Sequence, residues 1–377
     1  MDFSFSEEQQ MLRSSLRAFL QDRYAFEARR TATLSNSGWR PELWRALGQE
    51  LGVLALAFPE RVGGLDADAV STLVVMEELG RALVVEPYLD SVVVCGGLLR
   101  RAGGAVADAA LSGIGSGEQV MALAWSEPQA RYNFAAVNTR AQRSGDGWIL
   151  NGAKAVVIAA PWATQLLVTA RTSGETQDRD GISLFLVDKA TARITVSEYP
   201  TVDGRRAGDI VFNDVLLSAD ALIGEEGLAL PLIEQVADEA IAALCAEALG
   251  VASRLLEDTI DYTRQRRQFG QPIAQFQALQ HRMVDMYMQL EMARSATYLA
   301  TMKLAADPIE RALAASTAKV TVANACKFIG QNAVQLHGGM GMTDELAVSH
   351  YFRRATVIES EFGSADFHLA RHVRLSR

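Results

Sequence analysis

The sequence has few cysteines, and they do not form pairs along the chain. Cys95, Cys245 and Cys326 are the only three among 377 residues, and aliphatic residues surround each of them. An odd number of widely separated cysteines argues against the disulfide framework of a secreted protein. We therefore expect three reduced thiols in the core of a cytoplasmic protein.

A long apolar run and a positively charged leader are also missing. No apolar stretch approaches the roughly 18 residues that a membrane-spanning helix needs. The first residues, MDFSFSEEQQ, carry acidic side chains where a secretory signal carries positive ones. We expect a protein that neither crosses a membrane nor is exported.

Lysine and arginine are fewer than aspartate and glutamate, 36 against 45. The formal net charge is −9, and no stretch concentrates lysine and arginine into a basic face. A protein that binds nucleic acid must neutralise phosphates with such a face, so nucleic acid is not an expected partner. Any anionic ligand must be held by a few local cations or by backbone amides.

The composition that is present, 49% hydrophobic and 21% charged, is that of a globular protein, and the length exceeds that of one hydrophobic core. The patterning changes twice along the chain. Residues 1–117 are predicted to be helical, residues 118–223 are short apolar runs with a hairpin signal at Asp146-Gly147, and residues 224–377 are helical again. This order predicts an α+β protein with an N-terminal helical domain, a middle β-barrel or β-sandwich domain and a C-terminal four-helix bundle.

The clearest predicted helix begins near residue 279. Its apolar residues recur every three or four positions, which makes one stripe along about seven turns of helix. We interpret the methionines of this stretch as core packing. A second long helix is predicted to end at Gly338-Gly339. The stripe consists of Leu279, Met283, Met286, Leu290, Ala293, Thr297, Ala300 and Leu304.

Two stretches of the C-terminal part indicate a ligand site. In YTRQRRQFGQPIAQFQALQHRM, arginines at a helix end precede Phe269, a glycine, a proline and a new helix, which suits a pyrophosphate. In QLHGGMGMT, two glycines follow a helix, so backbone can approach a flat or phosphorylated ligand closely. His368 and His372 have a metal-compatible spacing, but the arginines beside them favour a basic helix terminus, and no metal site is predicted.

These two stretches closely resemble motifs of the acyl-CoA dehydrogenase family, Arg-x-x-Phe-Gly-x-Pro-Ile-x-x-Phe-Gln and Gln-x-x-Gly-Gly-x-Gly. The resemblance covers nearly the whole chain and includes LGVLALAFPERVGG, VVMEELGRAL, LNGAKAVV and DIVFNDVLLSADALIGEEG. It implies the family's fold and its reaction, in which a glutamate removes the α-proton of an acyl-CoA thioester while a hydride leaves Cβ for N5 of FAD. It also implies an electron-transfer flavoprotein as the electron acceptor.

The resemblance assigns FAD-binding roles to particular residues. In this fold the flavin lies between the β domain and the C-terminal helices, and a neighbouring subunit holds its ADP half. The flavin's own pocket matches less well, because Val156 and Ile158 stand where many members have a tryptophan and a threonine. The residues that the resemblance predicts to contact FAD are Arg266, Phe269, Gln277, Gln335, Gly338, Gly339, Ser126 and Ser364.

The catalytic base is missing from both positions that the family uses. One position precedes a Gly-Thr dipeptide, which here corresponds to Gly363-Ser364, and it holds Phe362. The other position, on an earlier helix, holds Ala240. Glu361 and Glu239 are each one residue away, which on a helix turns a side chain by roughly 100°. A misplacement of about 1 Å can cost on the order of a hundredfold in rate, so we predict no catalytic base in this chain.

The residues around Phe362 form the stretch VIESEFGSAD. We predict that its glutamates, Glu359 and Glu361, cap and solvate a turn.

These departures match a subgroup of the family. The chain looks most like the small subunit of pimeloyl-CoA dehydrogenase and like other base-lacking subunits of bacterial heterotetramers that act in fatty acid β-oxidation or steroid side-chain breakdown. We therefore predict a subunit that completes the FAD site of a larger catalytic partner. Two alternatives stay open: a self-sufficient homotetramer that uses Glu361 or Glu239, and a non-enzymatic scaffold or DNA-binding relative. Dicarboxylyl, medium-chain and steroid thioesters all remain possible substrates.

Overall fold

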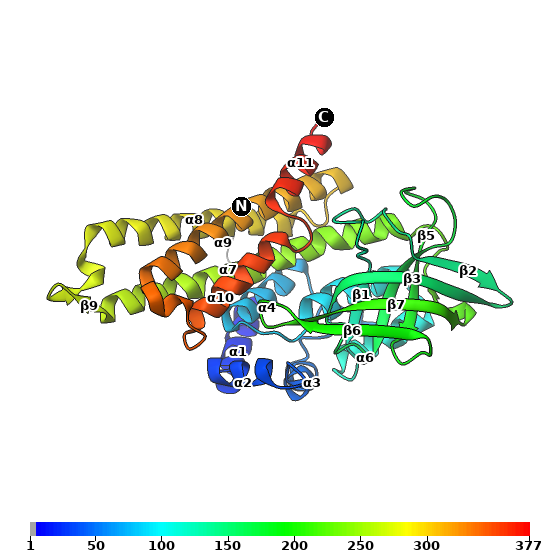
Figure 1. The fold of residues 1–377 in the computed structure, drawn as a ribbon, viewed down its shortest axis with the longest axis horizontal. Helices are drawn as coiled ribbons and strands as arrows, with labels where there is room; N and C mark the ends of the chain where they lie inside the picture. Colours follow the sequence, from blue (N-terminus) through cyan, green and yellow to red (C-terminus); the bar gives the residue numbers. More distant parts are fainter. Residues whose placement is uncertain (1–4) are drawn as a thin grey trace. The chain divides into compact units, whose positions relative to one another are not determined.

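The computed structural model describes residues 5–377 and shows helices, then strands, then helices again, as the sequence predicts (Figure 1). The chain packs into two compact units. Of the described residues, the helical unit comprises 5–31, 69–84 and 241–377, and the sheet unit comprises 32–68 and 85–240. The domain boundaries after residues 117 and 223 remain predictions, and the first four residues of the first predicted domain lie outside the described part.

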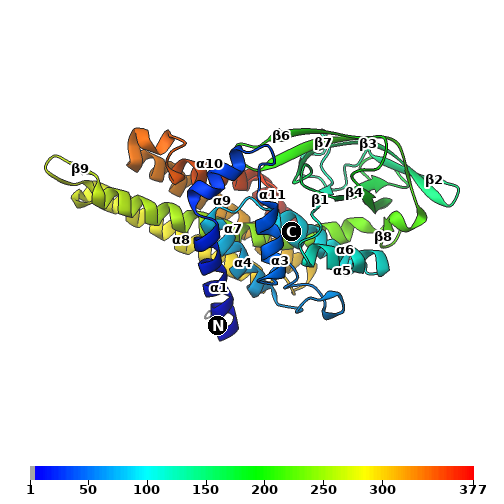
Figure 2. The same cartoon turned by 90° about the horizontal axis from the view of Figure 1, so that it is seen from below.

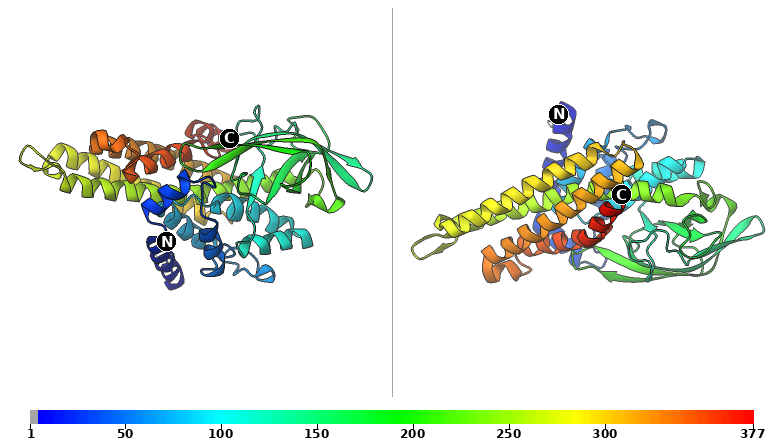
Figure 3. Two further views of the ribbon diagram at one scale, coloured as in Figure 1. Left: turned by 60° about the horizontal axis from the view of Figure 1, so that its bottom comes forward. Right: turned by 90° about the horizontal axis from the view of Figure 1, so that it is seen from above.

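Side chains cap the starts of three helices of the helical unit, whereas the helices that begin at Gln277 and Ala347 have no side-chain cap. Ser6 and Gln9 exchange hydrogen bonds between side chain and backbone, which forms a capping box at the first helix. Asp307 accepts hydrogen bonds from two backbone amides of α9, and Pro308 takes the first helical position. Figures 1 and 3 show α8 and α9 side by side. The elements are α1 (Glu7–Arg23), α2 (Phe26–Leu34, shared with the sheet unit), α4 (Ala69–Ala82), α7 (Ala229–Gln265, also shared), β9 (Arg267–Gln268), β10 (Gln271–Pro272), η4 (Ile273–Gln275), α8 (Gln277–Met302), α9 (Pro308–His337), η5 (Gly338–Met342), α10 (Ala347–Ser360) and α11 (Ala365–Leu375).

The predicted apolar stripe of α8 is confirmed at its centre. Met286, Leu290, Ala293, Thr297 and Ala300 are all buried. The interpretation of every methionine as core packing is wrong, however, because the methionines at 288, 292 and 302 lie on the exposed side of α8. A helix that is apolar on more than one side gives no sequence signal for which side faces the core.

The sheet unit contains one eight-stranded sheet in the order β6-β7-β3-β2-β4-β5-β8, and β1 pairs with β4. Its neighbours are antiparallel, except that β1 and β2 each run parallel to β4. Figure 2 shows β6, β7 and β3 next to one another. The register of β3 against β7 shifts between Lys154 and Val157, so β3 is irregular there. The strands are β1 (Met121–Ala124), β2 (Arg140–Ser144), β3 (Gly147–Ile158), β4 (Gln165–Arg171), β5 (Ile182–Asp188), β6 (Ile194–Pro200), β7 (Arg206–Leu217) and β8 (Leu222–Ile223); the helical elements are α3 (Pro41–Gln49), η1 (Glu60–Val62), η2 (Tyr88–Cys95), α5 (Gly96–Ala102), α6 (Ala105–Gly115) and η3 (Ala219–Ala221).

The three cysteines are buried and unpaired, as predicted. Burial raises the pKa of the Cys245 and Cys326 thiols to about 12, so both are protonated and unreactive at neutral pH. Among the helices of residues 5–377, none combines the length and the apolar character needed to cross a bilayer.

Two glycines set the distance between α4 and α7 in the helical unit. A Cβ built on Gly80 would lie 2.1 Å from the Glu247 carbonyl oxygen, and one built on Gly250 would lie 2.0 Å from the Glu77 carbonyl oxygen. Neither carbonyl can move without its helix, because each belongs to the backbone. The two helices therefore cross at a separation that only glycine permits.

We expect Gly250→Ala to destabilise the chain by about 2 kcal/mol, because the clash with a backbone carbonyl outweighs the helix propensity that alanine adds. Urea unfolding of the purified chain measures this difference. Gly339→Ala is the matched control, since a Cβ there meets no atom within 4 Å. An equal loss of unfolding free energy in the two variants would show that the close approach of α4 and α7 does not require glycine.

Candidate functional site

The turn between α10 and α11, residues 359–364, is held from inside the helical unit by Lys319 of α9. Its ammonium donates hydrogen bonds to three backbone carbonyls, those of Ile358 at 2.9 Å, Glu359 at 3.0 Å and Gly363 at 2.7 Å. Lys319 is fully buried, and this burial lowers its pKa. The last carbonyls of α10, which have no partner within their own helix, are thus satisfied by one buried cation.

His368 of α11 holds the same turn from the other side. Its Nε2 lies 3.0 Å from the Phe362 carbonyl oxygen and its Nδ1 lies 3.3 Å from Ser316 Oγ. A Cβ on Gly363 would lie 2.6 Å from His368 Nε2, which explains the glycine at that place. The prediction of a basic helix terminus is therefore wrong for His368, because burial keeps the imidazole neutral and lowers its pKa to about 4.

Phe362 sits at the centre of this turn, where the resemblance expects a base. It is half-buried, and its backbone has φ 56°, a left-handed conformation that costs a bulky residue about 1 kcal/mol or more. The hydrogen bonds from Lys319 and His368 hold the chain in that conformation. A phenyl ring has no proton acceptor, so the strained position offers no general base.

The nearest carboxylate, Glu361, is turned toward an arginine. Arg354 is 4% exposed and donates from Nε and Nη2 to both oxygens of Glu247, at 2.5 and 2.6 Å. Its Nη1 donates to Glu361 Oε2 at 2.9 Å. The prediction that Glu361 solvates the turn is wrong, because the buried guanidinium needs it as a counter-ion. Glu359 does act as a cap: its Oε1 accepts a hydrogen bond of 3.4 Å from the amide of Ala365, the first residue of α11.

The second position, Ala240, and its neighbour Glu239 lie on the part of α7 that belongs to the sheet unit. Ala240 is fully buried. Glu239 forms ion pairs with Arg100 and Arg101 of α5, and Arg100 also donates to the Ala57 carbonyl at 3.1 Å. A carboxylate held by two guanidinium groups has its oxygens occupied, so it is a poor candidate for a proton acceptor.

The end of the helical unit that carries the two family-like stretches has a different character. The rings of Tyr262 and His337 stack with their centres 4.3 Å apart, and Tyr262 Oη donates to the His337 carbonyl at 3.3 Å. This contact joins the ends of α7 and α9. It therefore brings Arg266, one residue beyond α7, to the same end of the unit as Gly338, which follows α9.

The side chains at this end face solvent. Phe269 is 89% exposed at the tip of the β9–β10 hairpin. Within the described residues the Arg266 guanidinium makes no protein hydrogen bond. A Cβ on Gly338 or Gly339 would meet nothing within 4 Å. An exposed cation, an aromatic ring and bare backbone together fit the ADP half of a flavin that approaches from outside this chain.

The loop that carries Ser126 is fixed by a buried ion pair in the sheet unit. Lys154 Nζ lies 2.7 Å from Glu127 Oε1 and 3.0 Å from Thr169 Oγ1. Burial lowers the pKa of Lys154 to about 8 and opposes ionisation of Glu127, but the ammonium outweighs it and holds the pKa of Glu127 at about 2. Ser126 itself is half-buried, and its carbonyl accepts from the Ala155 amide at 2.8 Å.

Val156 lies two residues after Lys154, in the irregular part of β3. It is 55% exposed and has φ 54°, which is a genuine outlier for a β-branched residue. Its amide donates to Asp209 Oδ1, which also accepts from Tyr199 Oη. The position where many relatives have an indole ring against the flavin therefore presents an aliphatic side chain to the outside.

The predicted site residues fall into two sets. Seven of them belong to the helical unit, whereas Ser126 belongs to the sheet unit. Ser364 caps α11 through its Oγ, which accepts from the Phe367 amide. Across residues 5–377 no group of three or more potential metal ligands occurs, so no metal centre is assigned. The seven are Arg266, Phe269, Gln277, Gln335, Gly338, Gly339 and Ser364.

Sequence reasoning missed Lys319 and Arg354. Lys319 lies among small and apolar residues on the buried side of a long helix, a position where a lysine must find acceptors. That pattern was available in the sequence. Arg354 has no comparable signal, because its partner Glu247 is 107 residues away.

Comparison with known proteins gives one consistent family. The descriptions "Acyl-CoA dehydrogenase, N-terminal domain", "middle domain" and "C-terminal domain" match residues 6–118, 122–215 and 231–374. The mitochondrial short-chain specific acyl-CoA dehydrogenase of Homo sapiens is 30% identical over 323 residues, 84% of this chain and 78% of the relative.

Solved structures agree with these matches. A structure described as the FAD complex of PigA has a TM-score of 0.91 and 27% identity, and the match covers 99% of this chain and 98% of that one. The ChsE4–ChsE5 complex from Mycobacterium tuberculosis has a TM-score of 0.86 and 28% identity over 99% of this chain and 98% of that one.

We expect the stability of the chain to fall between pH 6.5 and pH 4 in part because of His368. The unfolded imidazole binds a proton at its ordinary pKa of about 6.5, whereas the folded one resists protonation down to about 4. The unfolded state therefore binds more protons in this window, and stability is lost as the pH falls, by on the order of 3 kcal/mol.

Urea unfolding at several pH values, in wild type and in His368→Gln, checks this expectation. Glutamine can still donate to the Phe362 carbonyl but does not titrate, so the variant should lose less stability over the same pH range. His281→Gln on the exposed side of α8 is the control and should keep the wild-type pH dependence. If the unfolding free energy of His368→Gln and that of wild type change equally with pH, His368 is not the group responsible.

Proposed function

Because this chain belongs to the acyl-CoA dehydrogenase family, we propose that it is the base-lacking subunit of a heteromeric acyl-CoA dehydrogenase, active only together with a catalytic partner. The family consists of oxidoreductases that act on CH–CH groups, and its cofactor is FAD. In the proposed assembly the partner subunit supplies the general base and the acyl site, and this chain supplies part of the FAD site.

The observation that carries the proposal is the occupation of both base positions by side chains that cannot take a proton. Phe362 holds one position and Ala240 the other. The carboxylates next to them, Glu361 and Glu239, are bound to arginines. A general base must reach the substrate proton directly, and a side chain that already serves as a counter-ion does not.

The exposed end of the helical unit supports the other half of the proposal. Bound FAD supplies the hydride acceptor of the reaction. Arg266 offers a guanidinium to the pyrophosphate, and Gly338 and Gly339 let the backbone lie close to the adenosine part. Phe269 lies in the turn of the β9–β10 hairpin and Gln277 at the start of α8, and both are exposed on this chain, which suits a cofactor shared with a neighbouring subunit.

The comparison with ChsE4–ChsE5 supports a partner subunit, since that structure is described as a complex of two named components. We extend the proposal to the subgroup of the pimeloyl-CoA dehydrogenase small subunit, with a heterotetramer as the assembly. We further propose a cytoplasmic enzyme that passes electrons to an electron-transfer flavoprotein. Its acyl group would be dicarboxylyl, medium-chain or steroid, and substrate profiling of the assembled enzyme would identify it.

We expect the chain purified alone to reduce an electron-accepting dye with acyl-CoA thioesters at least about a hundredfold more slowly than its complex with the partner, because a positioned general base contributes roughly 10²–10⁴-fold. The partner to co-express is the acyl-CoA dehydrogenase of the neighbouring gene. Glu361→Gln and Glu239→Gln each remove a counter-ion of an arginine, so they should destabilise this chain but leave the activity per folded complex unchanged. Full activity of the chain alone that is abolished by Glu361→Gln would instead establish the self-sufficient homotetramer.

We expect Arg266→Gln to weaken the binding of FAD to the assembled complex by roughly tenfold to a hundredfold, the usual contribution of a charged hydrogen bond to an anion. Fluorescence titration of the flavin-depleted complex with FAD measures this change. Arg264→Gln is the matched control, because Arg264 is exposed and already paired with Asp261. If both variants lose affinity equally, Arg266 acts only through general positive charge and the assignment fails.

A further inference from the structure

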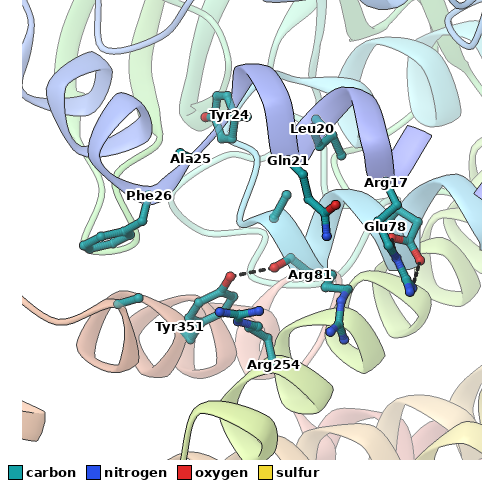
Figure 4. Close-up of a pocket in the computed structure, with 12 residues that line it drawn as sticks. Arg17, Leu20, Gln21, Tyr24, Ala25, Phe26, Glu78, Arg81, Arg254 and Tyr351 are labelled. Carbon is teal, nitrogen blue, oxygen red and sulfur yellow. Dashed lines mark hydrogen bonds and ion pairs between the residues drawn. The ribbon is translucent and has the colours of Figure 1, made fainter. Parts of the chain in front are cut away.

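The helical unit contains a cleft whose lining residues have no role in the site described above. It opens between α1, the start of α2, α4, α7 and α10, and has a volume of about 220 Å³ (Figure 4). A cavity of about 150 Å³ is large enough to hold benzene, so this cleft has room for a small organic molecule. Arg254 on α7 is about 21 Å along the helix from Ala240 and about 17 Å from the end that precedes Arg266.

The polar side chains of the cleft are mostly donors. Arg17 donates to both oxygens of Glu78, and Arg81 donates to both oxygens of Glu257. Glu78 is the only acidic residue of the lining, and its oxygens are occupied by these guanidinium contacts. An anion in the cleft would therefore face guanidinium groups and no open carboxylate.

Arg254 differs from the other two arginines because only one edge of its guanidinium is paired. Its Nε lies 2.9 Å from Asp258 Oδ1, four residues along α7. Among the described residues, its two Nη atoms donate no hydrogen bond to a protein acceptor. The pairing at Nε restricts the side chain, so the free edge is held ready for an acceptor with two oxygens.

A second unpaired donor lies across the cleft, on α1. The side-chain amide of Gln21 makes no hydrogen bond to another described residue. In Figure 4 it extends from α1 toward the side of the cleft where Arg81 and Arg254 lie. One guanidinium edge and one amide together match the oxygens of a single carboxylate.

The remaining walls are apolar. Leu20, Phe26, Ala82 and Ala347 line the cleft together with the buried rings of Tyr24 and Tyr351. The Phe26 ring is held by an edge-on contact with the His350 ring, 5.0 Å between centres. Tyr351 Oη donates to the Arg81 carbonyl at 2.5 Å, which fixes its ring as part of the wall. These surfaces suit a short apolar or aromatic body.

We propose that this cleft is a binding site for a small monocarboxylate with an aromatic or short aliphatic body, held by Arg254 and Gln21 and packed against Phe26 and Tyr351. The carboxylate meets the free edge of Arg254, and the body lies against the rings and alanines of the opposite walls. The site is formed by this chain alone, and the proposal does not depend on whether this chain has a catalytic base.

Titration of the full-length chain with benzoate, followed by ligand-observed NMR, tests the site. Benzyl alcohol has the same ring and no charge, so it should bind at least about tenfold more weakly if the guanidinium contributes a charged hydrogen bond. Arg254→Gln should weaken benzoate to a similar degree. Ala347→Phe, which fills the cleft, should remove benzoate binding while circular dichroism reports an unchanged fold.

Arg179→Gln is the control, because Arg179 is an exposed arginine paired with Glu234 in the sheet unit. It should bind benzoate as wild type does. The proposal is overturned if wild type shows no saturable benzoate binding, if benzyl alcohol binds as tightly as benzoate, or if Arg254→Gln and Ala347→Phe both bind like wild type. Loss of binding in Arg179→Gln would also overturn it, since the effect would then be nonspecific.

Discussion

A charge buried in a protein must be paired, and this constraint decides what the carboxylates of this chain can do. Breaking a buried ion pair typically costs about 3–5 kcal/mol, because the remaining charge is left without a partner. Both Glu247 and Glu361 are therefore needed as counter-ions of Arg354. In the sheet unit, Glu239 is likewise the counter-ion of Arg100 and Arg101. The glutamates that stand nearest to the family's base positions are structural counter-ions.

The same constraint makes the turn at residue 362 rigid. Lys319 is buried and forms no ion pair within residues 5–377, so its ammonium is bound by backbone carbonyls of the turn. His368 adds a contact to the Phe362 carbonyl. Together they hold a phenylalanine in a left-handed conformation that it does not favour. The turn is therefore held tightly by side chains of α9 and α11 but offers no general base at residue 362.

At the end of α7 and α9 that carries Arg266 and Gly338, the hydrogen-bond donors are exposed. Arg266 and Phe269 face solvent, and the backbone at Gly338 is uncovered. The Tyr262–His337 contact joins the two segments through side chains of the neighbouring helix ends. The carboxylates near residue 362 are thus paired within the chain, whereas the donors at this end are exposed, as the proposed sharing of a cofactor with a partner subunit requires.

The sequence alone determined the order of helices and strands, the buried stripe of α8 and the absence of a glutamate at residue 362, because periodicity, turn residues and residue identity are local properties. It could not decide that Glu361 is a counter-ion, that His368 is buried and neutral, or that Met288 is exposed. Each of these depends on how the helices pack: Arg354 is buried against Glu247, 107 residues away in the chain, and His368 against Ser316, 52 residues away. Only the tertiary structure decided them, since the pairing of charges and the choice between two apolar helix faces are set by packing.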